Sequence, residues 1–240
     1  MKEKFIQKLK LSTFSLKIIA IVAMTCCHFA ITFEEMLPFY LMFALNTVGG
    51  LTFPIMAYLI VEGYHKTSSI KKYFIRLFFF GLLSSYPAFL ILGRFSVLFT
   101  LLLGLCCLIL RDRIRNRYLF WLMFTGMTLI TVFFDWSIIG VPLIFAYGTV
   151  KGEKRRVIIS TITILIIGLM LTGILDVLRK GWSTQLALDA CFLFAGICAI
   201  PLLLSYNGKR GYSPHVLRYL FYIYYPVHLL GLWILKWLIY

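Results

Sequence analysis

Long apolar stretches recur along the whole chain and are separated by short clusters of charged and turn-forming residues. A bilayer-crossing helix needs about 20 predominantly apolar residues, and most of these stretches approach that length. The breaks between them are segments such as "EGYHKTSSIKK", "RDRIRNR", "KGEKRR" and "NGKRGYSPH". The pattern therefore predicts nine spans, at residues 14–33, 41–62, 73–92, 95–110, 118–134, 137–150, 157–177, 185–204 and 217–238.

Two of these spans, 95–110 and 137–150, are short for a bilayer, so a tilted arrangement or a re-entrant hairpin is an alternative for them. The second span contains two glycines and a proline between Gly49 and Pro54. These residues weaken the helical hydrogen bonds, so we expect a kink or a break there, with the freed carbonyl facing protein or a cavity rather than lipid. No internal repeat or soluble segment interrupts the series, which indicates one domain over residues 1–240.

Composition supports a membrane location. Of the 240 residues, 61% are hydrophobic and 14% are charged, and the mean hydropathy is +0.92. A soluble domain of this size offers water far more polar surface. The first apolar stretch is long and no small-residue cleavage site follows it, so a removable signal peptide is not expected. The fold class predicted is an all-α, polytopic integral membrane protein.

The distribution of basic residues predicts the orientation. With nine spans and the N-terminus in the cytoplasm, all but four of the 24 lysines and arginines lie on the cytoplasmic side, the four being Arg94, Arg179, Lys180 and Lys236. Such asymmetry is typical of multi-pass proteins and places the C-terminus outside. The net charge of +15 then reflects topology and attraction to anionic membrane lipid, and nucleic acid is not expected as a partner because there is no soluble basic domain.

Six cysteines all fall in apolar spans, including the adjacent pairs Cys26–Cys27 and Cys106–Cys107. Their spacings match no metal or disulfide pattern. We interpret them as buried free thiols and expect no bound metal.

Few ionisable residues lie deep in the predicted spans, and His28 and His228 are the foremost of them. Ionisable groups at membrane depth are costly and mark functional sites. Lys17 is eleven positions before His28, so both lie on one helix face about 16 Å apart. The structural alternatives are hydrogen-bonded, neutral imidazoles and a lysine that extends to the membrane surface.

Ordered motifs give the chain a family resemblance. The spacing Lys17-x10-His28 resembles the basic-x10-His signature of acyltransferase-3 membrane enzymes. The whole chain is more closely similar to the TraX family, membrane acetylases named for acetylation of the pilin N-terminus. The resemblance is carried in order by "LKIIAIVAMTCCHF", "LTFPIMAYLIVEGYHKTSSIKKYFIRL", "FSVLFTLLLGL", "DWSIIGVPLIFAYG", "NGKRG" and "LFYIYYPVHLL".

This resemblance implies an acyltransferase of the bacterial cytoplasmic membrane. It would move an acetyl group from cytoplasmic acetyl-CoA to an extracytoplasmic acceptor, such as the N-terminal amine of a peptide or pilin. The alternatives are an O-acetyltransferase of a surface glycan or lipid, a transporter without covalent chemistry, and a structural factor of a secretion or conjugation apparatus. Its partners would be membrane lipid, the acyl-CoA donor, and the peptide, glycan or lipid acceptor.

Roles for individual residues follow from this chemistry. A neutral His28 could take a proton from the acceptor, and His228 could polarise the thioester or orient the acceptor. If both act on one acetyl group, we expect the two imidazoles to open onto a shared cavity that reaches the cytoplasmic face near Lys17 and Arg76. Cationic contacts to the phosphates of CoA are expected from Lys17, Lys71, Lys72, Arg76, Lys209 and Arg210, although positive-inside topology explains most of these residues equally well.

Overall fold

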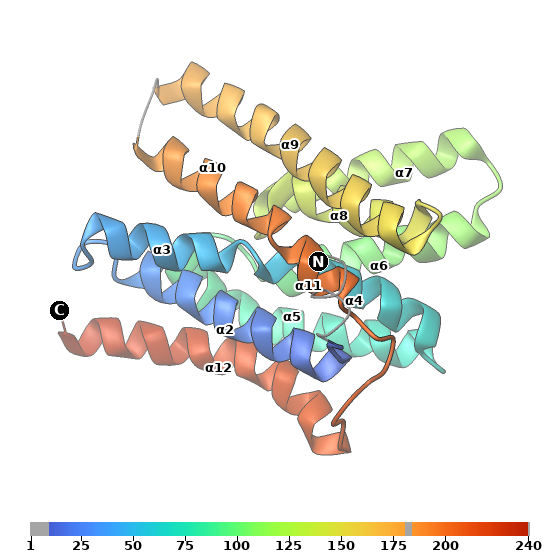
Figure 1. Cartoon of the computed structure of the whole chain (residues 1–240), viewed down its shortest axis with the longest axis horizontal. Coiled ribbons are helices and arrows are strands. Elements are labelled where there is room, and N and C mark those ends of the chain that lie inside the picture. The colour runs from blue at the N-terminus through green and yellow to red at the C-terminus, as the bar shows by residue number, and fades with distance from the viewer. Residues whose placement is uncertain (1–9, 181–183, 240) are drawn as a thin grey trace, which may run out of the picture.

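The computed structural model describes residues 10–180 and 184–239, and within these ranges the side chains of residues 172, 175, 176, 179, 180, 184–189, 215 and 218 are not described. Six of the basic residues counted for the orientation lie outside this description: Lys2, Lys4 and Lys8 entirely, and Arg179, Lys180 and Arg218 in their side chains. The described chain is helical, with two isolated β-bridges and no strand (Figure 1). Its elements are α2 (Thr13–Thr32), α3 (Phe39–Gly49), α4 (Thr52–Lys66), α5 (Ile70–Leu92), α6 (Val97–Arg113), α7 (Arg117–Ile130), η1 (Thr131–Phe133), α8 (Ser137–Thr149), α9 (Glu153–Lys180), α10 (Thr184–Ile197), α11 (Ala199–Leu204) and α12 (His215–Ile239).

The all-α prediction is confirmed, and helices cover each of the nine predicted spans. By length and composition, four stretches in the described part could cross a membrane: α2, α3 with α4, α5, and Tyr219–Ile239 of α12. The two spans predicted to be short are short in the structure, with 17 residues in α6 and 13 in α8. Nine crossings and their orientation stay a prediction.

The predicted break in the second span is confirmed. Helix α3 ends at Gly49 and α4 begins at Thr52. Pro54 has no amide hydrogen, so the carbonyl of Gly50 loses its helical partner. That carbonyl faces α10, where a Cβ on Gly196 would lie 3.3 Å from the Gly50 oxygen. A Cβ on Gly50 itself would lie 2.1 Å from the carbonyl oxygen of Phe192, so α10 packs against bare backbone at the break.

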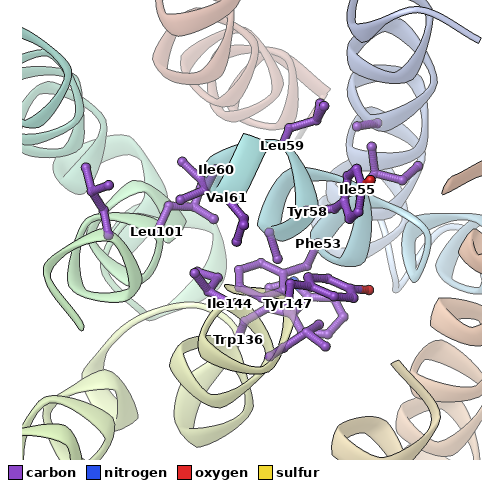
Figure 2. Packing of buried hydrophobic residues seen from close by; sticks show 14 of the residues in the cluster. Phe53, Ile55, Tyr58, Leu59, Ile60, Val61, Leu101, Trp136, Ile144 and Tyr147 are labelled. Carbon is purple, nitrogen blue, oxygen red and sulfur yellow. The ribbon is translucent and has the colours of Figure 1, made fainter. Parts of the chain in front are cut away.

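Helix α4 occupies the centre of the bundle and packs on α2, α6 and α8. Its segment from Phe53 to Val61 is almost entirely buried, which suits a helix that is apolar on all sides. Aromatic pairs join it to the two ends of α8 (Figure 2): Phe53 stacks on Trp136 at 4.6 Å, and the rings of Tyr58 and Tyr147 meet edge to face at 5.7 Å. These contacts pack the buried face of α4 against α8.

The helices that carry the predicted histidines are neighbours although they stand at opposite ends of the sequence. Helix α2 lies against both α3 and α12, and α12 also packs along α5 (Figure 1). The bundle thus brings the first and last helices of the described chain together beside α5.

Candidate active site

The imidazoles of His28 and His228 are in direct contact, 200 positions apart in sequence. Nδ1 of His28 lies 2.8 Å from Nε2 of His228, and the rings stack with their centroids 5.1 Å apart at 9°. His28 is buried, with 4% of its surface exposed. The structure thus brings the two histidines that the sequence analysis singled out into contact.

Hydrogen bonds fix which nitrogen carries each proton. Nδ1 of His228 lies 2.9 Å from the carbonyl oxygen of Tyr224, one turn earlier in α12. A carbonyl only accepts, so Nδ1 of neutral His228 carries the hydrogen and Nε2 has a lone pair. Nδ1–H of His28 then donates to that lone pair, which leaves the lone pair of His28 on its own Nε2. In this arrangement Nε2 of His28 has a lone pair that can accept a proton, and Nε2 of His228 accepts from His28.

Two tyrosines of α12 surround this pair. The ring of Tyr224 stacks on His228 at 4.9 Å and 9°. Thr25 donates to the carbonyl of Ile21 at 2.8 Å, so the Tyr224 hydroxyl, 2.7 Å from Thr25 Oγ1, donates to Thr25. The ring of Tyr225 contacts both imidazoles, with centroid distances of 6.0 Å to His28 and 5.6 Å to His228. The sequence analysis did not select these tyrosines, and their spacing of three and four positions before His228 was the available signal.

A cavity of about 530 Å³ lies between α2, α4, α5, α6, α12 and the segment 206–213. Along α2 its lining runs from Thr13 and Lys17 to Met24, which is one turn before His28. Tyr225 lines the cavity, whereas neither histidine is among the lining residues. The expectation that both imidazoles open directly onto the cavity is therefore corrected: the ring of Tyr225, which contacts both, stands at the cavity wall.

Basic side chains line the part of the cavity away from Tyr225. Four of the six predicted phosphate-binding residues are among the lining residues, namely Lys17, Lys72, Arg76 and Arg210. The remaining two, Lys71 and Lys209, are exposed and do not line it. Lys71 and Lys72 are neighbours on α5, and one helical position turns the side chain by about 100°, which separates their environments. The cavity also contains Lys66, which the sequence analysis did not select.

The charge balance of this region is positive. Glu62 is the one acidic side chain among the described residues that line the cavity. Its two oxygens contact Lys66 at 2.7 Å and Arg156 at 3.2 Å, so its charge is matched within the protein. Unlike Lys66 and Arg156, Arg76 forms no ion pair with Glu62 in the described part of the protein. Its Nε is buried without a hydrogen-bond partner, and its guanidinium lies 5.6 Å from the Tyr73 ring. A buried guanidinium nitrogen with no acceptor is suited to an anionic ligand.

The segment containing Arg210 is fastened to the start of α2. The amides of Thr13 and Phe14 donate to the carbonyls of Lys209 and Arg210 at 2.9 and 3.1 Å. Gly208 and Gly211 have φ values of +72° and +71°, which only glycine adopts without strain. Lys66 adds a bond to the Gly208 carbonyl at 2.9 Å. These contacts hold Arg210 at the cavity wall.

Within the described residues, no three histidine, cysteine or acidic side chains gather closely enough to hold a metal ion. The six cysteines are free thiols.

Comparisons with known proteins support one family. The family model described as "TraX protein" matches residues 12–236, a range that contains both histidines and all the residues that line the cavity. The chain is also 30% identical over 233 residues to the probable fimbrial assembly protein FimC, serogroup H1, of Dichelobacter nodosus, which covers 91% of this chain and 93% of that relative. No solved structure matches the chain.

Proposed function

This chain belongs to the TraX family, and on that premise we propose that it is a membrane-embedded acetyltransferase that uses cytoplasmic acetyl-CoA. The observation that carries the proposal is the hydrogen-bonded His28–His228 pair next to a cavity lined by cations. A base and an anion-binding cavity are the two features that transfer from a CoA thioester requires.

The proposed reaction uses the lone pair on Nε2 of His28. The acceptor amine or hydroxyl attacks the thioester carbonyl carbon while His28 takes its proton, and the carbonyl oxygen becomes an oxyanion. When the oxyanion reforms the carbonyl, the carbon–sulfur bond breaks and the proton on His28 passes to the departing thiolate. The products are an amide or ester and CoA with a free thiol. His228 stabilises the transient imidazolium by accepting from its Nδ1–H.

The acceptor is proposed to be extracytoplasmic, with a fimbrial or pilin N-terminal amine as first candidate because of the name of the relative. O-acetylation of a surface glycan or lipid is the alternative, since a hydroxyl would lose its proton to the same base. A relation to the acyltransferase-3 enzymes stays a hypothesis.

The decisive assay for the function is cleavage of the donor. Purified protein in lipid nanodiscs is incubated with acetyl-CoA labelled in the acetyl group, and free CoA and labelled products are measured. An acetyltransferase releases CoA through slow hydrolysis even without its acceptor, and faster when a pilin-derived peptide is added. A transporter or an assembly factor leaves the thioester intact, which would refute the proposal.

We further propose that the protein crosses the bacterial cytoplasmic membrane nine times, with its N-terminus in the cytoplasm. The cation-lined part of the cavity then faces the compartment that contains acetyl-CoA. Reporter fusions at the two ends of the chain are expected to report opposite compartments, cytoplasmic for the N-terminus. Reporters in the same compartment would contradict the odd number of crossings.

Arg76 offers a test of donor binding. Replacing Arg76 with glutamine is expected to raise the KM for acetyl-CoA about 10- to 100-fold, which corresponds to the loss of one charge-assisted hydrogen bond. Because the phosphates are bound equally in the ground and transition states, kcat should be unchanged. Initial rates over a range of acetyl-CoA concentrations measure both constants.

Lys71→Gln is the matched control, because Lys71 is on the same helix but is exposed outside the cavity. It removes the same unit of charge from the same end of α5. An equal rise in KM for acetyl-CoA in the two variants would show that net charge, and not the cavity, attracts the donor.

A further inference from the structure

The first turn of α6 faces the cavity at the place where Tyr225 lines it. Ser96 caps this helix by accepting from the Leu98 amide at 3.2 Å, and its hydroxyl lies 2.7 Å from that of Ser84. Ser84 donates to the Phe80 carbonyl, so the hydrogen of the Ser96 hydroxyl is donated to Ser84. Val97 occupies the first helical position, where an amide has no carbonyl of its own helix to bond. Val97 also lines the cavity.

The hydroxyl of Tyr225 points at this turn. Tyr225 is 3% exposed, and its hydroxyl is buried without a hydrogen-bond partner in the described part of the protein. The Ser96 hydroxyl and the Val97 amide are the groups beside it. A buried hydroxyl left unpaired costs about 1–3 kcal/mol. Such a group at a cavity wall indicates a ligand atom that accepts its hydrogen.

We propose that the Tyr225 hydroxyl and the Val97 amide form the oxyanion hole of the acetyl transfer reaction. This inference rests on the proposed function and names the groups that stabilise its intermediate. The oxygen that gains negative charge when the acceptor attacks the thioester lies between the two donors. The N-terminus of α6, a helix of 17 residues, adds the positive end of its dipole.

Tyr225 lies between the proposed oxyanion hole and His28, the proposed base. Its ring contacts His28 and His228 while its hydroxyl reaches the start of α6. A thioester carbonyl held against the Tyr225 hydroxyl is therefore separated from the imidazole of His28 by no more than the length of the Tyr225 side chain. The base and the oxyanion donors must flank the same carbon in acyl transfer, and this arrangement meets that requirement.

The carboxyl of Asp135 also interacts with Tyr225, and a negative charge there would oppose an oxyanion. Burial raises the pKa of Asp135, which favours its neutral form. Its Oδ1 accepts from the Trp136 amide at 2.9 Å, and this bond directs that oxygen toward the start of α8. Asp135 is therefore compatible with an anion at the first turn of α6.

Two substitutions each remove one donor. Tyr225→Phe deletes the hydroxyl and keeps the ring against both histidines. Val97→Pro deletes the amide hydrogen at the first helical position, where proline is tolerated, and Ser96 has ψ 135°, which suits a residue before proline. Each is expected to lower kcat for cleavage of acetyl-CoA about 10²–10³-fold with KM unchanged, since the oxyanion exists only in the transition state and intermediate.

Arg117→Pro is the matched control for the backbone change. Arg117 is the first residue of α7, is exposed, and follows Asn116, which has a ψ of 112°. Its kcat should equal that of the wild-type protein. If Val97→Pro does not elute as a folded protein in size-exclusion chromatography, Tyr225→Phe decides alone.

The outcomes separate this inference from the proposed function. Wild-type protein that does not cleave acetyl-CoA overturns both. Active wild-type protein with an undiminished kcat in Tyr225→Phe overturns the oxyanion hole and leaves the acetyltransferase proposal standing. A fall in kcat of Tyr225→Phe and Val97→Pro, with Arg117→Pro unaffected, supports both.

Discussion

Replacing His28 with alanine is expected to lower acetyl transfer about 10²–10⁴-fold, the contribution of a positioned general base. The physical reason is the direction of the hydrogen bonds. The lone pair of His228 on Nε2 accepts from His28, so the lone pair that is left to take a proton is on Nε2 of His28. Initial rates with labelled acetyl-CoA measure the effect. Acetyl-CoA binding should persist, because the basic residues that line the cavity are unchanged.

His65→Ala is the control for loss of an imidazole. His65 is exposed in the last turn of α4 and lines no part of the cavity. The His28→Asn variant, which keeps a polar side chain, guards against a purely structural effect of the alanine. A normal transfer rate in both His28 variants would mean that the histidine pair serves packing alone.

The break between α3 and α4 is expected to be the position most sensitive to a small change in volume. The Cβ of a Gly50→Ala variant would lie 2.1 Å from the Phe192 carbonyl oxygen and 2.9 Å from the Ala195 Cβ. The first contact is backbone, so α10 or the break must move, and overpacking of this kind costs about 3 kcal/mol or more. A loss of that size lowers the Tm of a chain of this length by roughly 6–12 °C.

Gly126→Ala provides the comparison within the same protein. Gly126 is inside α7, and a Cβ there meets nothing within 4 Å. Alanine favours a helix over glycine by about 1 kcal/mol, so this variant should have an equal or higher Tm. Thermal denaturation in one detergent measures both. Similar Tm values for the two variants would show that the packing of α10 on Gly50 contributes little.

Much of the helical architecture could be predicted from the sequence because lipid requires backbone hydrogen bonds to close within each segment. Runs of apolar residues therefore become helices wherever they are long enough, and Pro54 with the preceding glycines predicts the break. The number of crossings is harder to derive, since α6 and α8 are apolar but short.

The site was predictable only in part. His28 and Lys17 share a helix, and periodicity relates them. The contact of His28 with His228 depends on α2 packing against α12, and no local pattern encodes a neighbour 200 positions away. Aromatic residues are common in membrane helices, so the sequence alone does not distinguish Tyr225, whose proposed role depends on the position of α6.

Sequence alone also does not predict which of two adjacent basic residues lines the cavity. Lys209 and Arg210 are adjacent, yet Arg210 lines the cavity and Lys209 does not. The difference arises from the bonds of their carbonyls to the start of α2 and from the two glycines in left-handed conformation. Such loop geometry follows from tertiary contacts that composition and charge do not specify.

The most direct test of the account is an experimental structure of the protein in lipid with acetyl-CoA bound. The account predicts density for CoA in the cavity, with its phosphates at Arg76 and Arg210 and the thioester oxygen between the Tyr225 hydroxyl and the Val97 amide. Binding of acetyl-CoA outside this cavity, or an acetyl group remote from Tyr225 and His28, would contradict it.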